Sequence, residues 1–146
     1  MRELPRQLSA EELAELFEGK TRFVELLAER DDPLEHAPEV IAVLSEDEKH
    51  EVLDAHPAIG QTKGLSARSA AEQGTDVDPE VLAELARLNA AYEVRHGFRF
   101  VVFVNWRPKA EILEVLKARI DNPTDVELEI ALTELVAIAT DRWRRG

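Results

Sequence analysis

Signals that start and stop helices recur at short intervals along this chain, and they constrain its fold more than any other feature. A Ser with a Glu three residues later forms a capping box, and proline is favoured in the first helical turn. Such starts occur at Ser9 with Glu12, Ser45 with Glu48, Asp78-Pro79 and Pro108. Apolar residues at helical spacing follow each start, so the sequence predicts amphipathic helices there.

Glycine and proline end these predicted helices. Gly19 follows the first apolar stripe, Pro33 follows a second one, and Gly97 follows the stripe that begins after Pro79. Thr124 and Glu127 are spaced as a capping box, so we expect them to cap a last helix.

One stretch departs from the helical pattern. Phe98 to Trp106 (FRFVVFVNW) is rich in β-branched and aromatic residues and would locally favour a strand. A single strand has no partner for its backbone groups, so we expect extended or irregular structure there. The sequence therefore predicts an all-α fold, with residues 1–146 forming a single compact domain of roughly seven or eight helices.

Charge and composition exclude several classes of function. The net charge of −12 opposes binding to nucleic acid and to anionic lipid, because both interactions depend on Lys and Arg. The chain has no cysteine, which excludes disulfides, Cys-ligated metals and a thiol nucleophile. The N-terminal residues are charged throughout, and no stretch approaches the ~18 apolar residues that a membrane helix needs. We expect a cytoplasmic protein without a metal site.

His56 is the most informative polar residue. It precedes Pro57, which disfavours helical backbone, so it lies at or just beyond the C-terminal end of the helix that starts at Ser45. The negative end of the helix dipole would favour the imidazolium form, which suits a proton donor. The alternative is a histidine that ends a helix in a surface turn.

Two further groups could bind a small molecule. Ser69, Glu72 and Gln73 would share one face of a short helix, where they offer a hydroxyl, a carboxylate and an amide; the alternative is a solvated helix face. Arg142 continues the apolar stripe of the last helix. An arginine on such a stripe must be paired, must reach solvent or must bind an anion, unless it only complements the helix dipole.

A series of short motifs runs in a fixed order from His56 to the C-terminus. They are His56-Pro57, Ser69-x-x-Glu72-Gln73, Leu88-Asn89-x-x-Tyr92, Gly97-Phe98-x-Phe100-Val101, Lys109-Ala110-Glu111-Ile112-Leu113, Arg119-x-x-Asn122 and Arg142. This series resembles the 2-oxo-4-hydroxy-4-carboxy-5-ureidoimidazoline (OHCU) decarboxylases of urate degradation. The family often has Phe, Pro and Arg at the positions of His96, Arg99 and Asn105.

The resemblance implies an all-helical homodimer that decarboxylates OHCU, a small anionic substrate, to (S)-allantoin without a cofactor. Such an enzyme is a carboxy-lyase. Decarboxylation leaves an electron pair on the substrate ring, and the C=N unit of the substrate can delocalise it, so no cofactor is needed as an electron sink.

The resemblance also implies roles for individual residues. His56 would be the catalytic acid and base, with Pro57 shaping its turn. Glu72 would orient His56 or the ureido group, and it would bind substrate together with Ser69 and Gln73. Arg142 would hold a substrate oxygen. Backbone groups would come from Phe100, Val101, Val102, Phe103 and Val104.

Two other functions remain open on the sequence. The chain could be a helical module that binds a purine-derived ligand without turnover, or a module that binds a protein partner through an exposed helix face. Neither would convert OHCU.

Overall fold

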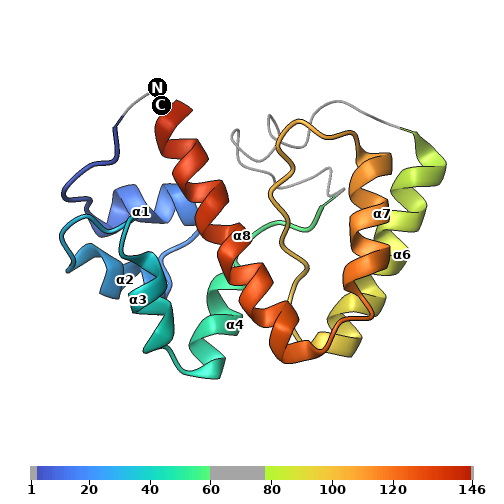
Figure 1. Ribbon diagram of the computed structural model, residues 1–146, viewed down its shortest axis with the longest axis horizontal. Helices are drawn as coiled ribbons and strands as arrows, with labels where there is room; N and C mark the ends of the chain where they lie inside the picture. Colours follow the sequence, from blue (N-terminus) through green and yellow to red (C-terminus); the bar gives the residue numbers. More distant parts are fainter. Residues whose placement is uncertain (1–2, 60–77, 146) are drawn as a thin grey trace.

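The last helix, α8 (Thr124–Arg145), runs through the middle of the molecule and separates two groups of helices (Figure 1). The computed structural model describes residues 3–59 and 78–145. On one side of α8 lie the first three helices; α4 lies beneath α8, and α6 and α7 form a pair on the other side. The bounds of these helices are α1 (Ala10–Phe17), α2 (Arg22–Ala28), α3 (Ala37–Ala42), α4 (Glu46–Asp54), α6 (Pro79–His96) and α7 (Lys109–Arg119). Because α8 contacts α1, α3, α4 and α6, it is the central element of the core.

The described residues contain helices and no strand, which confirms the all-α prediction. Two of the three predicted capping boxes form. The Ser9 hydroxyl accepts from the Glu12 amide and the Ser9 amide donates to the Glu12 carboxylate, each at 3.1 Å. Ser45 and Glu48 make the same reciprocal pair at 3.1 and 2.8 Å. These helix starts are therefore determined by local sequence.

Two predicted helix boundaries are wrong in detail. Helix α1 ends one residue early, because Glu18 rather than Gly19 adopts the left-handed conformation, with a φ of 65°. Glu127 does not cap α8: its side chain is fully buried and its carboxylate binds side chains of other elements. In both cases a tertiary contact uses the carboxylate, as described below.

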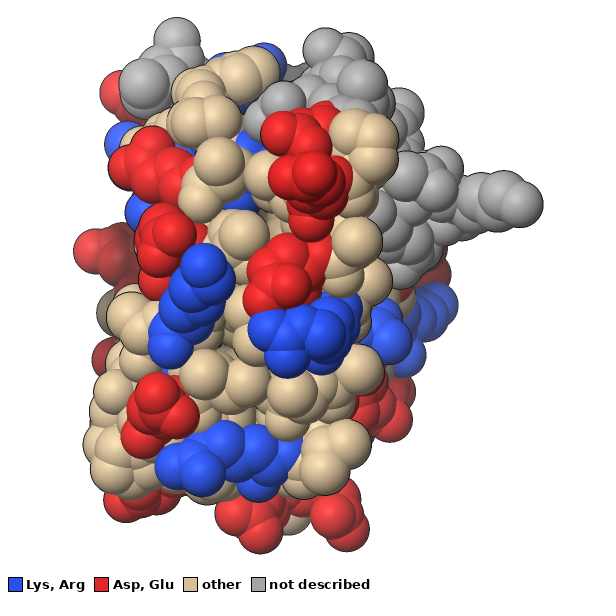
Figure 2. All heavy atoms as spheres, turned by 90° about the vertical axis from the view of Figure 1, so that its right-hand side faces the viewer, with Lys and Arg blue, Asp and Glu red and all other residues tan. Residues whose placement is uncertain are grey.

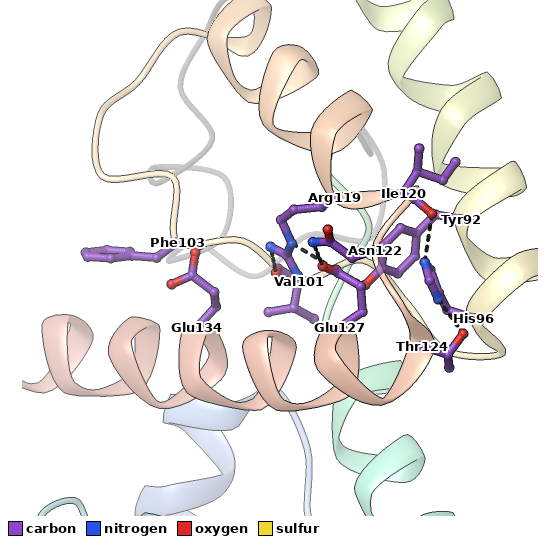
Figure 3. A network of polar contacts seen from close by, with 10 residues as sticks. All are labelled: Tyr92, His96, Val101, Phe103, Arg119, Ile120, Asn122, Thr124, Glu127 and Glu134. Carbon is purple, nitrogen blue, oxygen red and sulfur yellow. Dashed lines mark hydrogen bonds and ion pairs between the residues drawn. The ribbon is translucent and has the colours of Figure 1, made fainter.

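The carboxylate of Glu127 is the centre of a buried polar network (Figure 3). It accepts hydrogen bonds from the Tyr92 hydroxyl at 2.6 Å, from Arg119 Nε at 2.9 Å and from Asn122 Nδ2 at 2.8 Å. Arg119 also donates to the Val101 carbonyl at 2.9 Å. The network thus joins α6, α7 and α8 to the segment 98–106.

The segment 98–106 has an irregular conformation, as predicted, and it runs through the core as far as Val104, while Trp106 is exposed. Phe98, Phe100 and Val101 are almost fully buried. The Phe100 ring packs edge-on against Tyr92 and lies beneath the guanidinium of Arg119 at 4.6 Å. The apolar side chains that favour a strand locally here fill the space between α6, α7 and α8.

The outer face of the α6–α7 pair carries acidic and basic side chains interspersed with one another (Figure 2). Among the described residues, no helix has the length and apolar character needed to span a bilayer.

Candidate active site

His56 lies directly after α4, as the sequence predicts. Helix α4 ends at Asp54, and the His56 amide donates to the Leu53 carbonyl at 3.1 Å, which continues the last turn. The residue is only 7% exposed, so the alternative of a surface turn is wrong. Within the described part of the chain, Nδ1 of the His56 ring has no hydrogen-bond partner. A buried polar atom of this kind is costly unless a ligand or substrate meets it.

The pKa of His56 moves in the direction opposite to the one expected from the helix dipole. The pKa is lowered from 6.5 to about 4: burial is the largest cause, the positive charges of Arg142 and Arg99 also lower it, and the negative charge of Glu18 opposes them. The prediction of an imidazolium was therefore wrong, because desolvation and two arginines outweigh the dipole. At neutral pH the ring is uncharged and can accept a proton.

Arg142 lies near the C-terminal end of α8 and is buried, with 1% of its surface exposed. Its Nη1 donates to the Leu16 carbonyl at 3.1 Å and lies 2.9 Å from a carboxylate oxygen of Glu18. This arginine therefore points inward and is paired, which is one of the outcomes that its place on the apolar stripe left open. Glu18 can reach it because the left-handed conformation at the end of α1 turns the chain.

Two helix ends meet around His56, and each one is bound by an arginine. Arg142 contacts the end of α1 through Leu16, and Arg99 contacts the end of α4 through the carbonyls of Asp54 and His56. The C-terminal end of a helix carries partial negative charge, which a guanidinium neutralises. At the His56 ring, the charges of Arg142 and Arg99 outweigh the charge of Glu18, and their combined effect disfavours the imidazolium form. Such a site suits an anionic ligand.

The turn after His56 is anchored to α6. Asn89 donates from Nδ2 to the Ile59 carbonyl at 2.9 Å, and both residues are buried. Pro57 lies between His56 and this anchor. The predicted motif that contains Asn89 thus contacts the loop that carries His56.

The predicted substrate-facing stretch, 100–104, has several of its carbonyl groups engaged by arginines. Arg119 binds the Val101 carbonyl, and Arg107 binds the carbonyls of Phe103 and Val104 at 2.6 and 3.1 Å. A substrate could therefore use these oxygens only through their second lone pair. The role of the remaining backbone groups of Phe100 to Val104 stays a prediction.

Ser69, Glu72 and Gln73 lie outside the described residues, so their predicted roles remain predictions. The prediction of no metal site also remains open. On the surface, Asp32, Glu35 and His36 bring ligand atoms within 4.8 Å of one another, an arrangement that exposed acidic residues often adopt without an ion.

Two residues beside His56 were not predicted. Glu18 carries no local signal, because a Glu at the end of a helix is ordinarily solvated. Arg99 lies inside the apolar stretch FRFVVFVNW, where a single cation could have indicated a buried ion pair or carbonyl contact.

Comparison with known proteins shows the family of this chain. A sequence model of the OHCU decarboxylase family matches residues 2–144. The chain belongs to the OHCU decarboxylase family. The structure is similar to a crystal structure of an OHCU decarboxylase in the presence of (S)-allantoin, with a TM-score of 0.76 and 27% identity; the match covers 92% of this chain and 95% of that one.

Relatives of this chain include proteins named as bifunctional and proteins named as decarboxylases. A uric acid degradation bifunctional protein of Arabidopsis thaliana is 39% identical over 104 residues, which are 65% of this chain and 32% of that protein. A 2-oxo-4-hydroxy-4-carboxy-5-ureidoimidazoline decarboxylase of Haloferax volcanii is 29% identical over 99 residues, which are 65% of this chain and 59% of that protein. The chain thus spans about a third of the bifunctional relative.

Proposed function

We propose that this protein is a carboxy-lyase that converts OHCU to (S)-allantoin in urate degradation. The family match over residues 2–144 supports the reaction. The observation that carries the proposal is the buried His56, whose ring has an unpartnered Nδ1 among the described residues and lies in the field of Arg142. The site offers a neutral base beside a cation, which is what a hydroxylated carboxylate substrate requires.

In the proposed mechanism, His56 accepts the proton of the substrate hydroxyl. The bond to the carboxylate breaks, CO₂ leaves, and the electron pair passes into the ring, where the C=N unit of the substrate delocalises it. His56 then donates the proton it took from the hydroxyl to one face of a ring carbon. A second proton, taken from solvent, goes to the ring nitrogen and balances the loss of CO₂ from the carboxylate. A pKa of about 4 keeps the ring neutral before the reaction, so that a ring nitrogen is free to accept a proton.

Other residues would orient the substrate around this proton transfer. Arg142 would hold an oxygen that carries negative charge, and Glu72 would orient His56 or the ureido group. Ser69 and Gln73 would bind the ring, with Pro57 shaping the turn. Backbone groups and the apolar wall of residues 100–104 would exclude water and favour dispersal of the carboxylate charge.

Circular dichroism of a reaction with freshly generated OHCU tests this proposal. We expect (S)-allantoin to form faster than in the spontaneous reaction, which gives a racemate. A stoichiometric complex with OHCU without turnover would instead identify a ligand-binding module, and no effect on OHCU would rule out both.

The variant His56→Asn tests the proposed base. We expect a loss of at least roughly 100-fold in kcat, because removal of a general base costs about 10²–10⁴-fold. The matched control is His36→Asn, which replaces a partly exposed histidine on the surface. Full activity in His56→Asn would contradict the role of His56.

We also propose a homodimer in the cytoplasm. The family resemblance supports the dimer, and the absence of cysteine is compatible with a reducing compartment. Sedimentation at micromolar concentration and fractionation of cells test the two statements; a monomer or a secreted protein would contradict them.

A further inference from the structure

The guanidinium of Arg99 binds the backbone of His56. Its Nη1 donates to the His56 carbonyl at 2.6 Å and to the Asp54 carbonyl at 3.2 Å. These are carbonyl groups that the end of α4 leaves without a helical partner. Arg99 therefore completes the hydrogen bonding of α4 and of His56 together.

Arg99 is itself held from several directions. Its Nε lies 3.2 Å from the Glu93 carboxylate, and its backbone amide donates to the Asp54 carboxylate at 3.0 Å. Gly97, with a φ of 80°, turns the chain from α6 towards α4 just before Arg99. Phe98 packs against the His50 ring at 5.2 Å. The position of the guanidinium is thus fixed by α4, α6 and its own backbone.

This contact has a consequence for the His56 ring. Among the described residues, no group hydrogen-bonds to Nδ1 of the ring. The described backbone contacts of His56 are the Leu53 carbonyl and the Arg99 guanidinium. Of these two contacts, only the one with Arg99 is made by a side chain. Because Arg99 binds the carbonyl of His56 and not its ring, Nδ1 stays available to a substrate.

The charges around His56 come from three elements. Arg142 reaches it from α8, Glu18 from the end of α1 and Arg99 from the segment after α6, while Asp54 on its own helix end is bound by the Arg99 amide. Burial lowers the pKa of His56 most, and both arginines lower it further. Loss of the Arg99 charge is therefore expected to raise this pKa.

We propose that Arg99 is the positioning residue of the active site, which holds His56 in a reactive position through its backbone carbonyl. Arg99 does not need to contact the substrate. This role rests on the proposed function, since it assigns to Arg99 the placement of the catalytic base.

The test compares Arg99→Met and Arg99→Lys with the control Arg95→Met. Arg95 is also near the end of α6 and also donates to a backbone carbonyl, that of Asp121, but it is exposed and makes no contact with His56. In Arg99→Met we expect kcat to fall roughly 10- to 100-fold with KM changed less than about threefold, because a misplaced catalytic group affects the reaction more than binding. Arg99→Lys should recover part of this loss, and Arg95→Met should retain full activity.

Titration distinguishes positioning from a structural role. In Arg99→Met, the acid limb of kcat/KM should move to higher pH, and the NMR signals of the His56 ring should titrate at higher pH than in the wild type. Arg99→Lys, which keeps the charge, should titrate close to the wild type. Wild-type kcat and an unshifted His56 titration in Arg99→Met would overturn the proposal, as would a loss of kcat in Arg99→Lys equal to that in Arg99→Met.

The NMR titration also separates the two proposals. If the wild type does not convert OHCU, the proposed function fails, while the shift of the His56 titration still tests the contact with Arg99. If Arg99→Met does not fold, Arg99→Gln takes its place in the same tests. A reduced kcat with KM changed less than about threefold would support the positioning role, and wild-type kcat with an unshifted His56 titration would overturn it.

Discussion

Protonation of His56 destabilises the folded protein relative to the unfolded chain. Its pKa is lowered from 6.5 to about 4, chiefly by burial. Between these pH values the unfolded chain binds a proton at His56 and the folded chain does not. The free energy of unfolding therefore falls as the pH is lowered through this range.

This linkage predicts a difference in acid stability between the wild type and His56→Asn. From pH 7 to pH 4.5 the wild type should lose about 2 kcal/mol more unfolding free energy than the variant, in which position 56 does not titrate. Urea denaturation at the two pH values measures this. Equal losses in the two proteins would show that His56 keeps an ordinary pKa when folded.

Glu127 is the second residue whose environment determines its role. Its carboxylate is fully buried and is bound by Tyr92, Arg119 and Asn122. Removal of one partner from a buried ion pair leaves the other charge without compensation.

We therefore expect Glu127→Ala to lower the free energy of unfolding by about 3–5 kcal/mol. The control is Glu129→Ala, an exposed position on the same helix, which should change it by less than about 0.5 kcal/mol. Tyr92→Phe removes one hydrogen bond to the carboxylate and should cost about 1.5–3 kcal/mol. Similar stabilities of the Glu127 and Glu129 variants would contradict the central role of the network.

At the scale of elements, the helix ends determine how the parts of the site meet. The N-terminal ends follow local rules, as the two capping boxes demonstrate. The C-terminal ends of α1 and α4 are instead completed by Arg142 and Arg99, which come from distant parts of the chain. Local sequence therefore predicts where these helices begin, but it does not predict which residues bind their C-terminal ends.

The end of α6 depends on Gly97. Its amide donates to the Glu93 carbonyl at 2.8 Å, and its φ of 80° is unfavourable for any residue with a Cβ atom. Gly97→Ala should lower the free energy of unfolding by about 1–2 kcal/mol. Thermal or urea denaturation measures the difference.

Gly19→Ala is the matched control for this substitution. Gly19 has no left-handed φ, and a Cβ there would lie 3.4 Å from the Ala55 Cβ, an ordinary packing distance. We expect a change of less than about 1 kcal/mol. If both glycine variants were equally stable, the conformation at Gly97 would not be the reason for its presence.

At the scale of the whole molecule, the charge of the protein and the charge of the proposed substrate have the same sign. With a net charge of −12, the protein would not attract an anion over long distances. Capture must depend on local groups, with Arg142, His56 and backbone amides as the donors to test. The two arginines beside His56 provide a positive field over a short range.

Salt should therefore affect substrate binding weakly. Between about 0.05 and about 0.3 M NaCl we expect KM for OHCU to stay within about twofold or to decrease, because salt screens the repulsion more than the short-range contacts. Steady-state kinetics at constant pH measures this. A steep rise of KM with salt would indicate long-range attraction and contradict this account.

Local sequence by itself determined the helical character of this protein. The capping boxes at Ser9 and Ser45, the proline at position 79 and the glycine at position 97 act within one turn of chain, so the pattern alone predicts them. The place of Arg142 on an apolar stripe indicated an inward direction as one possibility, and the packing of α8 against α1 decided between the alternatives.

Tertiary structure decided the chemistry of the site. The left-handed Glu18, the contact of Arg99 with His56 and the burial of Glu127 each join residues far apart in the sequence. The protonation of His56 likewise depends on distant residues, because desolvation and the charges of Arg142 and Arg99 outweigh the dipole of its own helix. These effects arise only when distant segments pack together, and no local pattern encodes them.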